Sequence, residues 1–119
     1  MKLTAYLQKI KYMNPEAIKA YDILKMATIE GAEVLGLQKE IGTIEIGKKA
    51  DIIVIDTNNL KFSPENDIST ALVYAINGND VLTTIVDGKV LMENRKFLYS
   101  DEELVKTHVK QNAKRLLES

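Results

Sequence analysis

Side chains that commonly carry catalysis are scarce in this sequence. It has one histidine, His108, and no cysteine. A catalytic zinc ion usually takes three protein ligands, mostly histidine, and one histidine cannot supply that set. A Ser–His–Asp triad with His108 is formally possible, but no G-x-S-x-G nucleophile elbow occurs. The phosphate loop G-x-x-x-x-G-K-S/T and the dinucleotide motif G-x-G-x-x-G are also missing. We therefore predict no catalytic, cofactor-binding or metal-binding residue in this chain.

His108 belongs to a predicted C-terminal helix over 101–117. It lies on the apolar face of that helix, and no second histidine or cysteine can join it, so we expect a buried or partly buried packing histidine. The charges of the helix run from acidic to basic, which suits the helix dipole. We expect a solvated face and no nucleic-acid patch, because the 16 basic residues are balanced by 17 acidic ones. The charged residues concerned are Asp101, Glu102, Glu103, Lys106, Lys110, Lys114, Arg115 and Glu118.

Length and composition indicate an ordinary globular protein. The 119 residues suffice for one domain with a modest core, and 45% of them are hydrophobic and 28% charged. The net charge of -1 gives no pull toward nucleic acid or anionic lipid. No apolar run approaches the roughly 18–20 residues that span a bilayer, and the N-terminus lacks a secretory signal. We expect a soluble cytoplasmic protein with neither nucleic-acid nor membrane partners, and the absence of cysteine fits a reducing compartment.

The segment IGTIEIGKKADIIVID, residues 41–56, contains the most distinctive turn. Gly42 and Gly47 permit backbone conformations that a side chain would resist. Asp51 follows at the exit of the turn, where its carboxylate can accept hydrogen bonds from backbone amides. We therefore favour a structural role for Asp51. The run after it, residues 52–56, is apolar without alternation, which is typical of a strand covered on both faces.

The first 36 residues contain helical patterns only. Apolar residues recur at helical spacing over 2–12 and again over 17–35. Between the two runs, Asn14-Pro15-Glu16 combines a capping residue, a proline and an acid, which predicts a new helix start. Gly36 is a plausible stop for the last helix.

The remainder predicts strands, one short helix and the terminal helix. TIEI at 43–46 alternates with period 2, and a polar loop with Pro64 spans 57–66. A helix capped by Asp67 follows over 67–76, then a turn at 77–80. Asp87-Gly88 between apolar runs predicts a hairpin of 81–86 and 90–95. Ser100-x-x-Glu103 has the form of a capping box. These patterns predict an α+β fold whose small sheet includes 52–56, 81–86 and 90–95, with the 101–117 helix packed on or beside it.

Two passages of the sequence resemble the C-terminal passage of the amidohydrolase superfamily. The first, TIEGAEVLGLQKEIGTIEIGKKADIIVID, matches a helix followed by a glycine turn and a strand. Its matching residues are Ala27, Thr28, Gly31, Ala32, Leu35, Gly36, Leu37, Ile41, Gly42, Ile44, Gly47, Lys48, Ala50, Asp51 and Asp56. The second passage, VLTTIVDGKVLMENRKF, resembles the hairpin that follows in the family. ALVYAINGNDV is similar to the branch that holds S-adenosylhomocysteine/methylthioadenosine deaminases and triazine chlorohydrolases.

The resemblance implies an architecture larger than this chain. Family members have a TIM-type (β/α)8 barrel and a small β-sandwich built from both chain ends. On that pattern, residues 1–37 are helices from the end of the barrel, 38–100 contribute in part to the composite sandwich, and 101–119 form a C-terminal helix. The family's histidine and aspartate metal ligands would all precede Met1, and Asp51, Asp56 and Asp87 align with sandwich positions. The resemblance thus implies a C-terminal part of a larger hydrolase, as a cloned fragment, a proteolytic product or a natural short homologue.

Two hypotheses for function are open, the first of which follows from the resemblance. In the first, the chain is the C-terminal structural portion of a zinc- or iron-dependent hydrolase that acts on C–N or C–Cl bonds of purine- or triazine-like rings. The parent would then be an adenosine-derivative deaminase, in which a metal-activated water attacks a ring carbon, and this chain alone would be inactive. In the second, the chain is a non-catalytic binding or assembly module.

Both hypotheses bear on association. If the barrel and the N-terminal strands of a parent enzyme normally cover this chain, apolar surface is exposed without them. We therefore expect the remainder of the barrel enzyme as the partner in the parent, and self-association of the isolated chain by sheet extension or helix exchange. The side chains expected to be exposed are Leu3, Leu7, Ile10, Leu24, Ile52, Val54, Ile85 and Val90.

Overall fold

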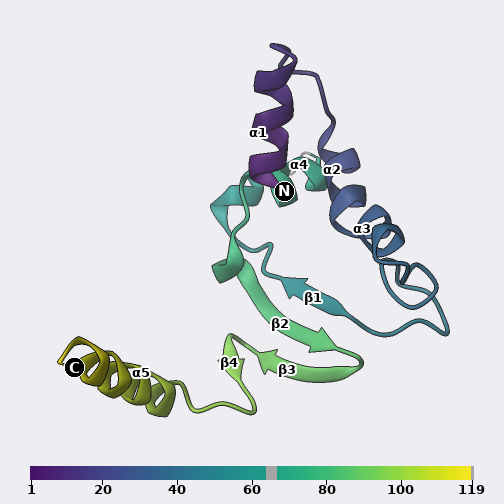
Figure 1. Ribbon diagram of the computed structural model, residues 1–119. Coiled ribbons are helices and arrows are strands. Elements are labelled where there is room, and N and C mark those ends of the chain that lie inside the picture. The colour runs from purple at the N-terminus through teal and green to yellow at the C-terminus, as the bar shows by residue number, and fades with distance from the viewer. Residues whose placement is uncertain (64–66, 119) are drawn as a thin grey trace.

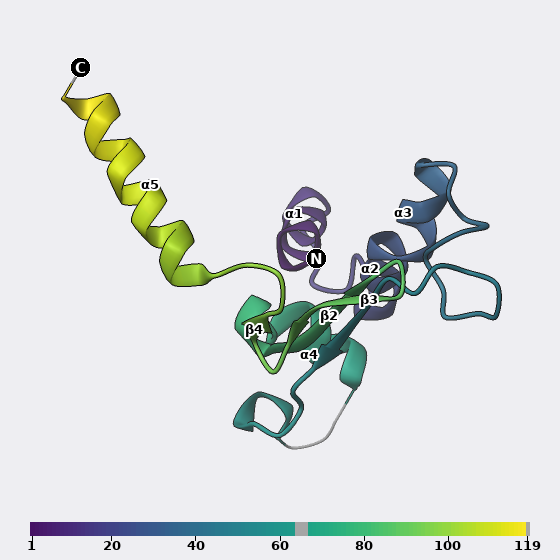
Figure 2. The ribbon, with the colours of Figure 1, turned by 90° about the horizontal axis from the view of Figure 1, so that it is seen from below.

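The computed structural model describes residues 1–63 and 67–118, and it is an open α+β arrangement (Figure 1). Helices lie at one end, a small sheet in the middle, and the C-terminal helix projects from the far side of the sheet (Figures 1 and 2). The radius of gyration of the Cα atoms is 18.4 Å. A compact domain of this length has a radius of about 13.5 Å. The chain is therefore far more extended than a self-contained domain.

Three helices form the N-terminal part: α1 (Lys2–Lys11), α2 (Ala20–Ala27) and α3 (Ile29–Val34). The predicted helix start at Asn14-Pro15-Glu16 is wrong, because α2 begins only at Ala20. Asn14 Oδ1 accepts a hydrogen bond from the Glu16 amide at 2.9 Å, so Asn14 closes a tight turn between α1 and α2.

The stop predicted for the third helix is confirmed. Gly36 has φ +72°, the left-handed conformation that glycine adopts without steric cost. The Gly36 amide donates to the Glu33 carbonyl, and the Leu37 amide donates to the Ala32 carbonyl. This pair of bonds is the Schellman arrangement that satisfies the last carbonyls of a helix.

The apolar core is small and lies among α1, α2 and α4 (Ile68–Tyr74). Its buried side chains are Ala5, Ala20, Ile23 and Val73, against which Ile18 and Tyr74 pack. Asp67 caps α4 as predicted, accepting hydrogen bonds from the Ser69 and Thr70 amides. The predicted turn at 77–80 is a short 3-10 helix, η2 (Gly78–Asp80), and a second one, η1 (Leu60–Phe62), lies within the loop that precedes α4. Pro64, which marked that loop in the sequence, falls outside the described residues.

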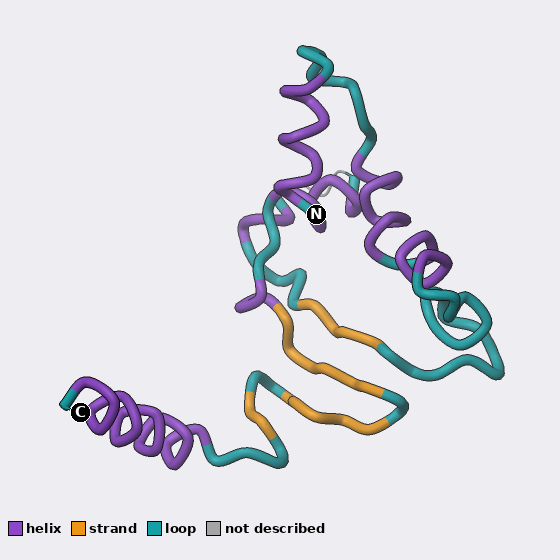
Figure 3. Tube along the Cα trace, viewed as in Figure 1, coloured by secondary structure: helices purple, strands orange, loops and turns teal. Residues whose placement is uncertain are grey.

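The sheet has four antiparallel strands in the order β1-β2-β3-β4 (Figure 3). They are β1 (Ile52–Ile55), β2 (Val81–Val86), β3 (Lys89–Glu93) and β4 (Lys96–Phe97). The predicted hairpin is confirmed: Asp87 and Gly88 both have positive φ, the conformation of a type I′ turn between β2 and β3. The expected second strand over 90–95 ends early, at Glu93, because Asn94 and Arg95 also adopt positive φ and form the turn that leads into β4.

The expectation that 52–56 is covered on both faces is wrong for this chain. Within the described ranges β1 is an edge strand that pairs only with β2, and Ile53 and Val54 are 55% and 45% exposed. The alternating segment 43–46 forms no strand, and Ile44 and Ile46 in it are exposed. The sequence pattern fits a covered strand, and the cover is absent from the described residues.

The C-terminal helix α5 (Glu102–Leu117) departs from two expectations. Its cap is Asp101, whose Oδ1 accepts from the Glu103 and Leu104 amides, and Ser100 is not the cap. The helix does not pack on the sheet, and each of its residues is exposed (Figure 2). His108 is therefore exposed and is not a packing histidine within this chain.

The accessible surface area also shows that the chain is more open than a compact domain. It is 9429 Å² for the 13.4 kDa chain, whereas a compact monomer of that mass exposes about 6,500 Å². The excess of about 2,900 Å² lies within the range of large obligate protein interfaces. Of the apolar side chains expected at the surface, Leu3, Leu7, Ile10 and Val54 are exposed, while Leu24, Ile52, Ile85 and Val90 are partly buried.

Candidate functional site

Within residues 1–63 and 67–118, the charged residue that the fold buries is Asp80, at the end of η2. Only 8% of Asp80 is exposed. Its two oxygens accept hydrogen bonds from Lys61 Nζ at 2.7 and 2.6 Å, and the Asn77 amide donates to Oδ2 at 2.9 Å. Asn77 Oδ1 in turn accepts from the Asn79 amide, so η2 closes its own N-terminus. The cluster joins η1, which carries Lys61, to the start of β2.

A second carboxylate, that of Asp56, continues this network at the end of β1. The Asp56 amide donates to the Asp80 carbonyl at 2.8 Å, which extends the pairing of β1 with β2. Asp56 Oδ1 accepts from the Asn58 amide, and Oδ2 lies 3.3 Å from a guanidinium nitrogen of Arg95. Each carboxylate oxygen of Asp56 therefore serves a turn or an ion pair.

The surroundings of Asp80 hold the pKa of its carboxyl below the ordinary value. The hydrogen bond from Lys61 is the largest cause, followed by the Asn77 amide, while partial burial acts in the opposite direction. A lowered pKa keeps Asp80 ionised near neutral pH, so it cannot act as a proton donor there. This arrangement is typical of a structural ion pair.

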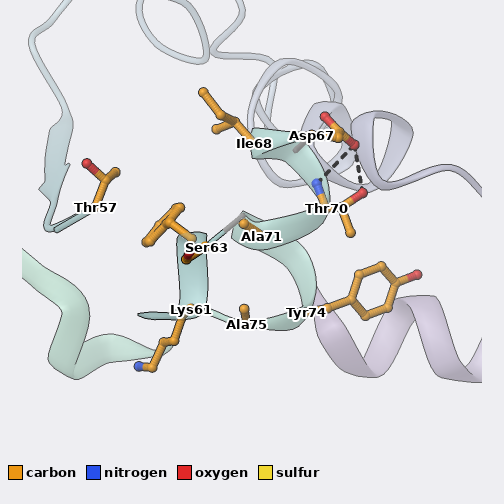
Figure 4. Close-up of a pocket in the computed structure, with 10 residues that line it drawn as sticks. Thr57, Lys61, Ser63, Asp67, Ile68, Thr70, Ala71, Tyr74 and Ala75 are labelled. Atoms are coloured by element: carbon orange, nitrogen blue, oxygen red, sulfur yellow. Dashed lines mark hydrogen bonds between the residues drawn. The ribbon is translucent and has the colours of Figure 1, made fainter. Parts of the chain in front are cut away.

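A pocket of about 630 Å³ lies between η1 and α4 (Figure 4). Ala71 of α4 and Ala75, which follows α4, line one side of it, and Ser63, which follows η1, lines the other (Figure 4). Its two oppositely charged groups are already engaged, since Asp67 caps α4 and bonds the Thr70 hydroxyl, and Lys61 binds Asp80. The hydroxyls of Thr57 and Ser63 have no histidine beside them among the lining residues. These lining residues therefore form no nucleophile–base pair.

The side chains that could bind a metal ion are also not grouped together in the described residues. Across residues 1–63 and 67–118, no group of three histidine, cysteine, aspartate or glutamate residues could hold one. Zinc needs such a group, and His108 stands on the projecting helix α5. The described residues therefore do not fit a zinc or iron ion.

The structure explains why Asp51 follows the glycine turn. Its Oδ1 accepts a hydrogen bond from the Asp87 amide at 2.7 Å, and the Gly88 amide donates to the Ala50 carbonyl at 3.1 Å. Asp51 therefore ties the start of β1 to the tip of the β2–β3 hairpin. Sequence reasoning foresaw an amide as its partner, but placed that amide in the local turn.

Sequence reasoning missed Lys61 and Asp80 as a pair. They are 19 positions apart, and both lay in segments interpreted only as loop or turn. One signal was present: Asn77 and Asp80 have the spacing of a capping box, and the structure shows both of its hydrogen bonds. Nothing local indicated that Lys61 would reach the same carboxylate. Asp51, Asp56 and Asp87, which the resemblance places in the sandwich, all lie at strand ends.

Residues 1–91 match the Amidohydrolase family, which is more than half of the chain. The chain belongs to this family. None of its helices in the described ranges is long and apolar enough to cross a membrane.

Relatives with assigned activities are much longer than this chain. The 5'-deoxyadenosine deaminase of Methanobrevibacter smithii is 51% identical over 104 residues, which are 87% of this chain and 24% of that protein. The 5-methylthioadenosine/S-adenosylhomocysteine deaminase of Acetivibrio thermocellus is 47% identical over 117 residues, 98% of this chain and 27% of that protein. The chain thus spans about a quarter of the length of the curated relatives it matches.

Solved structures give the same correspondence in three dimensions. An adenosine deaminase from Xanthomonas campestris with bound zinc superposes on 99% of this chain with a TM-score of 0.92 and 28% identity, over 27% of that protein. Atrazine chlorohydrolase from Arthrobacter aurescens, complexed with zinc, covers 82% of this chain with a TM-score of 0.71 and 28% identity, over 21% of that protein. The resemblance to the deaminase and triazine-hydrolase branches is confirmed by both sets of relatives.

Proposed function

We propose that this chain is the C-terminal structural portion of a metal-dependent hydrolase that deaminates an adenosine derivative. The proposal is supported above all by the superposition of 99% of the chain, at a TM-score of 0.92, on a quarter of a zinc-bound adenosine deaminase. The curated relatives are deaminases of 5'-deoxyadenosine, methylthioadenosine and S-adenosylhomocysteine. In the broader form of the proposal, the bond broken is C–N or C–Cl in a purine- or triazine-like ring.

The role of this chain in such an enzyme is to complete the fold. The described residues hold no metal ligand set, so the metal and the reacting groups would come from elsewhere in the whole protein, and no chemical step is assigned to this chain. This chain would contribute surface on which the rest of the enzyme packs. That surface comprises the edge of the sheet at β1 and an apolar groove of about 530 Å³ between α2–α3 and β1. Ala27, Ala32 and Ile52 line that groove.

Reconstitution from two pieces tests the proposal. The Methanobrevibacter smithii relative, shortened by the quarter that this chain matches, would be co-expressed with this chain in the presence of zinc. We expect neither piece alone to release ammonia from 5'-deoxyadenosine, and the two together to do so, because the groove and the β1 edge are then covered. If the two pieces neither co-purify nor show activity, the proposal fails, and turnover by this chain alone would contradict its inactivity.

A matched pair of variants sharpens this experiment. Ile53→Lys puts a charge on the exposed face of β1, where it changes little in this chain but would be buried in the reconstituted enzyme. Glu33→Lys changes an exposed residue of α3 and serves as the control. We expect the first to abolish reconstitution and the second to leave it intact.

The alternative, a non-catalytic binding or assembly module, makes a different forecast. A module of that kind would be complete by itself, so it would sediment as a compact monomer and bind no dye that detects exposed apolar surface.

A further inference from the structure

The turn between α4 and β2 contains the dipeptide Asn77-Gly78, and both residues are exposed. An asparagine can lose its side-chain amide without an enzyme, because the next backbone nitrogen is placed to close a five-membered ring with the side-chain carbonyl carbon. A side chain on the following residue hinders this approach, and glycine has none. No other asparagine in the sequence is followed by glycine. The chemistry of the sequence therefore favours Asn77 for this reaction.

The reaction has two steps, which need only this chain and water. In the first, the Gly78 nitrogen attacks Cγ of Asn77: a C–N bond forms, the bond from Cγ to Nδ2 breaks, and ammonia leaves with the proton of the Gly78 amide. The product is a succinimide ring. In the second step, water adds to one of the ring carbonyls and opens the ring. Residue 77 then becomes either an aspartate or an isoaspartate, in which the main chain runs through the side-chain carbon.

The structure leaves the attacking nitrogen accessible. Within residues 1–63 and 67–118, the Gly78 amide donates no hydrogen bond to a carbonyl or a side chain. A Cβ atom built on Gly78 would meet nothing within 4 Å. Neither a bonding partner nor a packed neighbour among the described residues therefore holds this nitrogen away from the Asn77 side chain.

The fold slows the reaction without blocking it. Asn77 Oδ1 accepts a hydrogen bond from the Asn79 amide at 2.9 Å, and the Asn77 amide donates to Asp80 Oδ2 at 2.9 Å. Asn77 has ψ 178°, which keeps its Cβ atom and the Gly78 nitrogen staggered, whereas ring closure needs them nearly eclipsed. The turn must therefore open briefly. That opening costs little, because η2 is a single exposed turn with the poor hydrogen-bond geometry of 3-10 helices.

Asp87-Gly88, at the tip of the β2–β3 hairpin, is the competing site for the same ring. An aspartate followed by glycine forms the ring by losing water in place of ammonia. Here the Gly88 amide donates to the Ala50 carbonyl at 3.1 Å, so the attacking nitrogen is engaged. A carboxylate is also a poorer electrophile than a neutral amide. The structure therefore favours Asn77 over Asp87.

Conversion of Asn77 would disturb the carboxylate of Asp80, which is 8% exposed. An aspartate at position 77 sets a second negative charge beside that carboxylate, and like charges repel. An isoaspartate adds a carbon atom to the main chain between α4 and β2, which moves the amide of residue 77 relative to its acceptor on Asp80. Both products therefore weaken the hydrogen bonding that holds Asp80, together with Lys61, at the start of β2.

We propose that Asn77 is a deamidation site, and that its conversion weakens the Asp80 cluster, which joins η1 to the start of β2. The inference goes beyond the proposed enzymatic role and does not rest on it, because the reaction needs no metal and no other chain. The contacts that carry it lie within residues 77–80 and at Lys61.

Ageing of the full chain in mildly alkaline buffer provides the first test. Peptide mass spectrometry locates each asparagine that has exchanged its NH2 group for OH, and a methyltransferase specific for isoaspartate measures that product. We expect Asn77 to convert before every other asparagine, with isoaspartate among the products. Earlier conversion of another asparagine, or an intact Asn77 in the aged chain, would overturn the proposal.

Gly78→Ala is the matched control, aged beside the unchanged chain. Gly78 has no positive φ, and an added methyl group meets nothing within 4 Å, so the variant should keep the fold, which circular dichroism verifies. We expect conversion of Asn77 to slow about tenfold or more, because the methyl group crowds the attacking nitrogen.

The consequence for Asp80 is measured by urea unfolding of both chains before and after ageing. The unfolding midpoint of the unchanged chain should fall in proportion to the converted fraction of Asn77, and that of Gly78→Ala should stay where it was. Equal conversion rates in the two chains, or an aged unchanged chain with an undiminished midpoint, would contradict the proposal.

Discussion

Gly42 provides the sharpest test of how the turn over 41–47 holds the strand to the helices. A methyl group added to Gly42 would lie 2.8 Å from the Ala32 Cβ atom and 3.1 Å from the Thr28 carbonyl oxygen. Real carbon atoms in contact lie at about 3.5–4.0 Å. The residue also has φ +96°, which side chains rarely adopt.

The expected loss of stability for Gly42→Ala has two parts. The unfavourable φ costs about 1–2 kcal/mol. Forcing a methyl group against backbone and Ala32 adds about 1–3 kcal/mol, the usual range for overpacking. We therefore expect the free energy of unfolding to fall by about 2–5 kcal/mol, a large share of the stability of a small domain.

Gly47→Ala is the matched control for this substitution. Gly47 has φ +92°, nearly the same as Gly42, but nothing lies within 4 Å of the position that an added methyl group would take. Both changes restrict the unfolded chain equally, so that term cancels between them. Urea unfolding followed by circular dichroism should show a smaller loss for Gly47→Ala, of about 1–2 kcal/mol. Equal losses at the two positions would refute the close approach of the turn to α3.

Three further expectations concern the acids and the metal. Asp51→Ala should lower the free energy of unfolding by about 0.5–1.5 kcal/mol in urea, because the Asp87 amide loses its acceptor but stays accessible to water. The folded-state pKa of Asp80 is lowered from 3.8, so its stabilising effect is present above that pH and is lost as pH falls through 3.8 toward the lower value. Thermal unfolding of Asp80→Asn should accordingly depend less on acidification than that of the unchanged chain. Dialysed protein should contain no stoichiometric zinc or iron by elemental analysis, and about one tightly held ion per chain would contradict the ligand inventory of the described residues.

Local signals in the sequence predicted local structure well. Asp87-Gly88 gave the hairpin, Asp67 the cap of α4 and Gly36 the end of α3, each through contacts within a few residues. The predicted helix start at Asn14 was wrong because this local signal fits two structures. Its side chain bonds the Glu16 amide, as in many tight turns, and a cap and a turn look alike over three residues.

The candidate site was less accessible to sequence reasoning. The lack of catalytic motifs was predicted from the sequence, whereas the Lys61–Asp80 pair needed the fold, because the partners are 19 positions apart. Asp51 shows an intermediate case. Its residue type and position predicted an amide as partner, but the amide belongs to Asp87, 36 positions away.

The errors at β1 and α5 have a common physical origin. An unalternated apolar strand such as Ile52–Ile55 and an apolar stripe such as that of α5 both indicate that something covers them, but not what. In a self-contained domain the cover is another segment of the same chain, and packing α5 on the sheet follows from that assumption. Here β1 is an exposed edge and α5 stands apart. The patterns predicted burial, and the described residues do not provide it.

The difference between local contacts and long-range burial also explains how the individual helices and turns can form in so open a structure. Caps, turns and the hairpin depend on contacts between residues close in sequence. These contacts determine where each helix or strand begins and ends, whatever its position relative to the other elements. The arrangement of the elements depends on burial, and the core side chains Ala5, Ala20, Ile23 and Val73 bury too little apolar surface to hold helices and sheet together. The groove of about 530 Å³ between α2–α3 and β1 separates the two layers. The surface excess of about 2,900 Å² over a compact monomer is therefore surface that the described elements do not cover for one another.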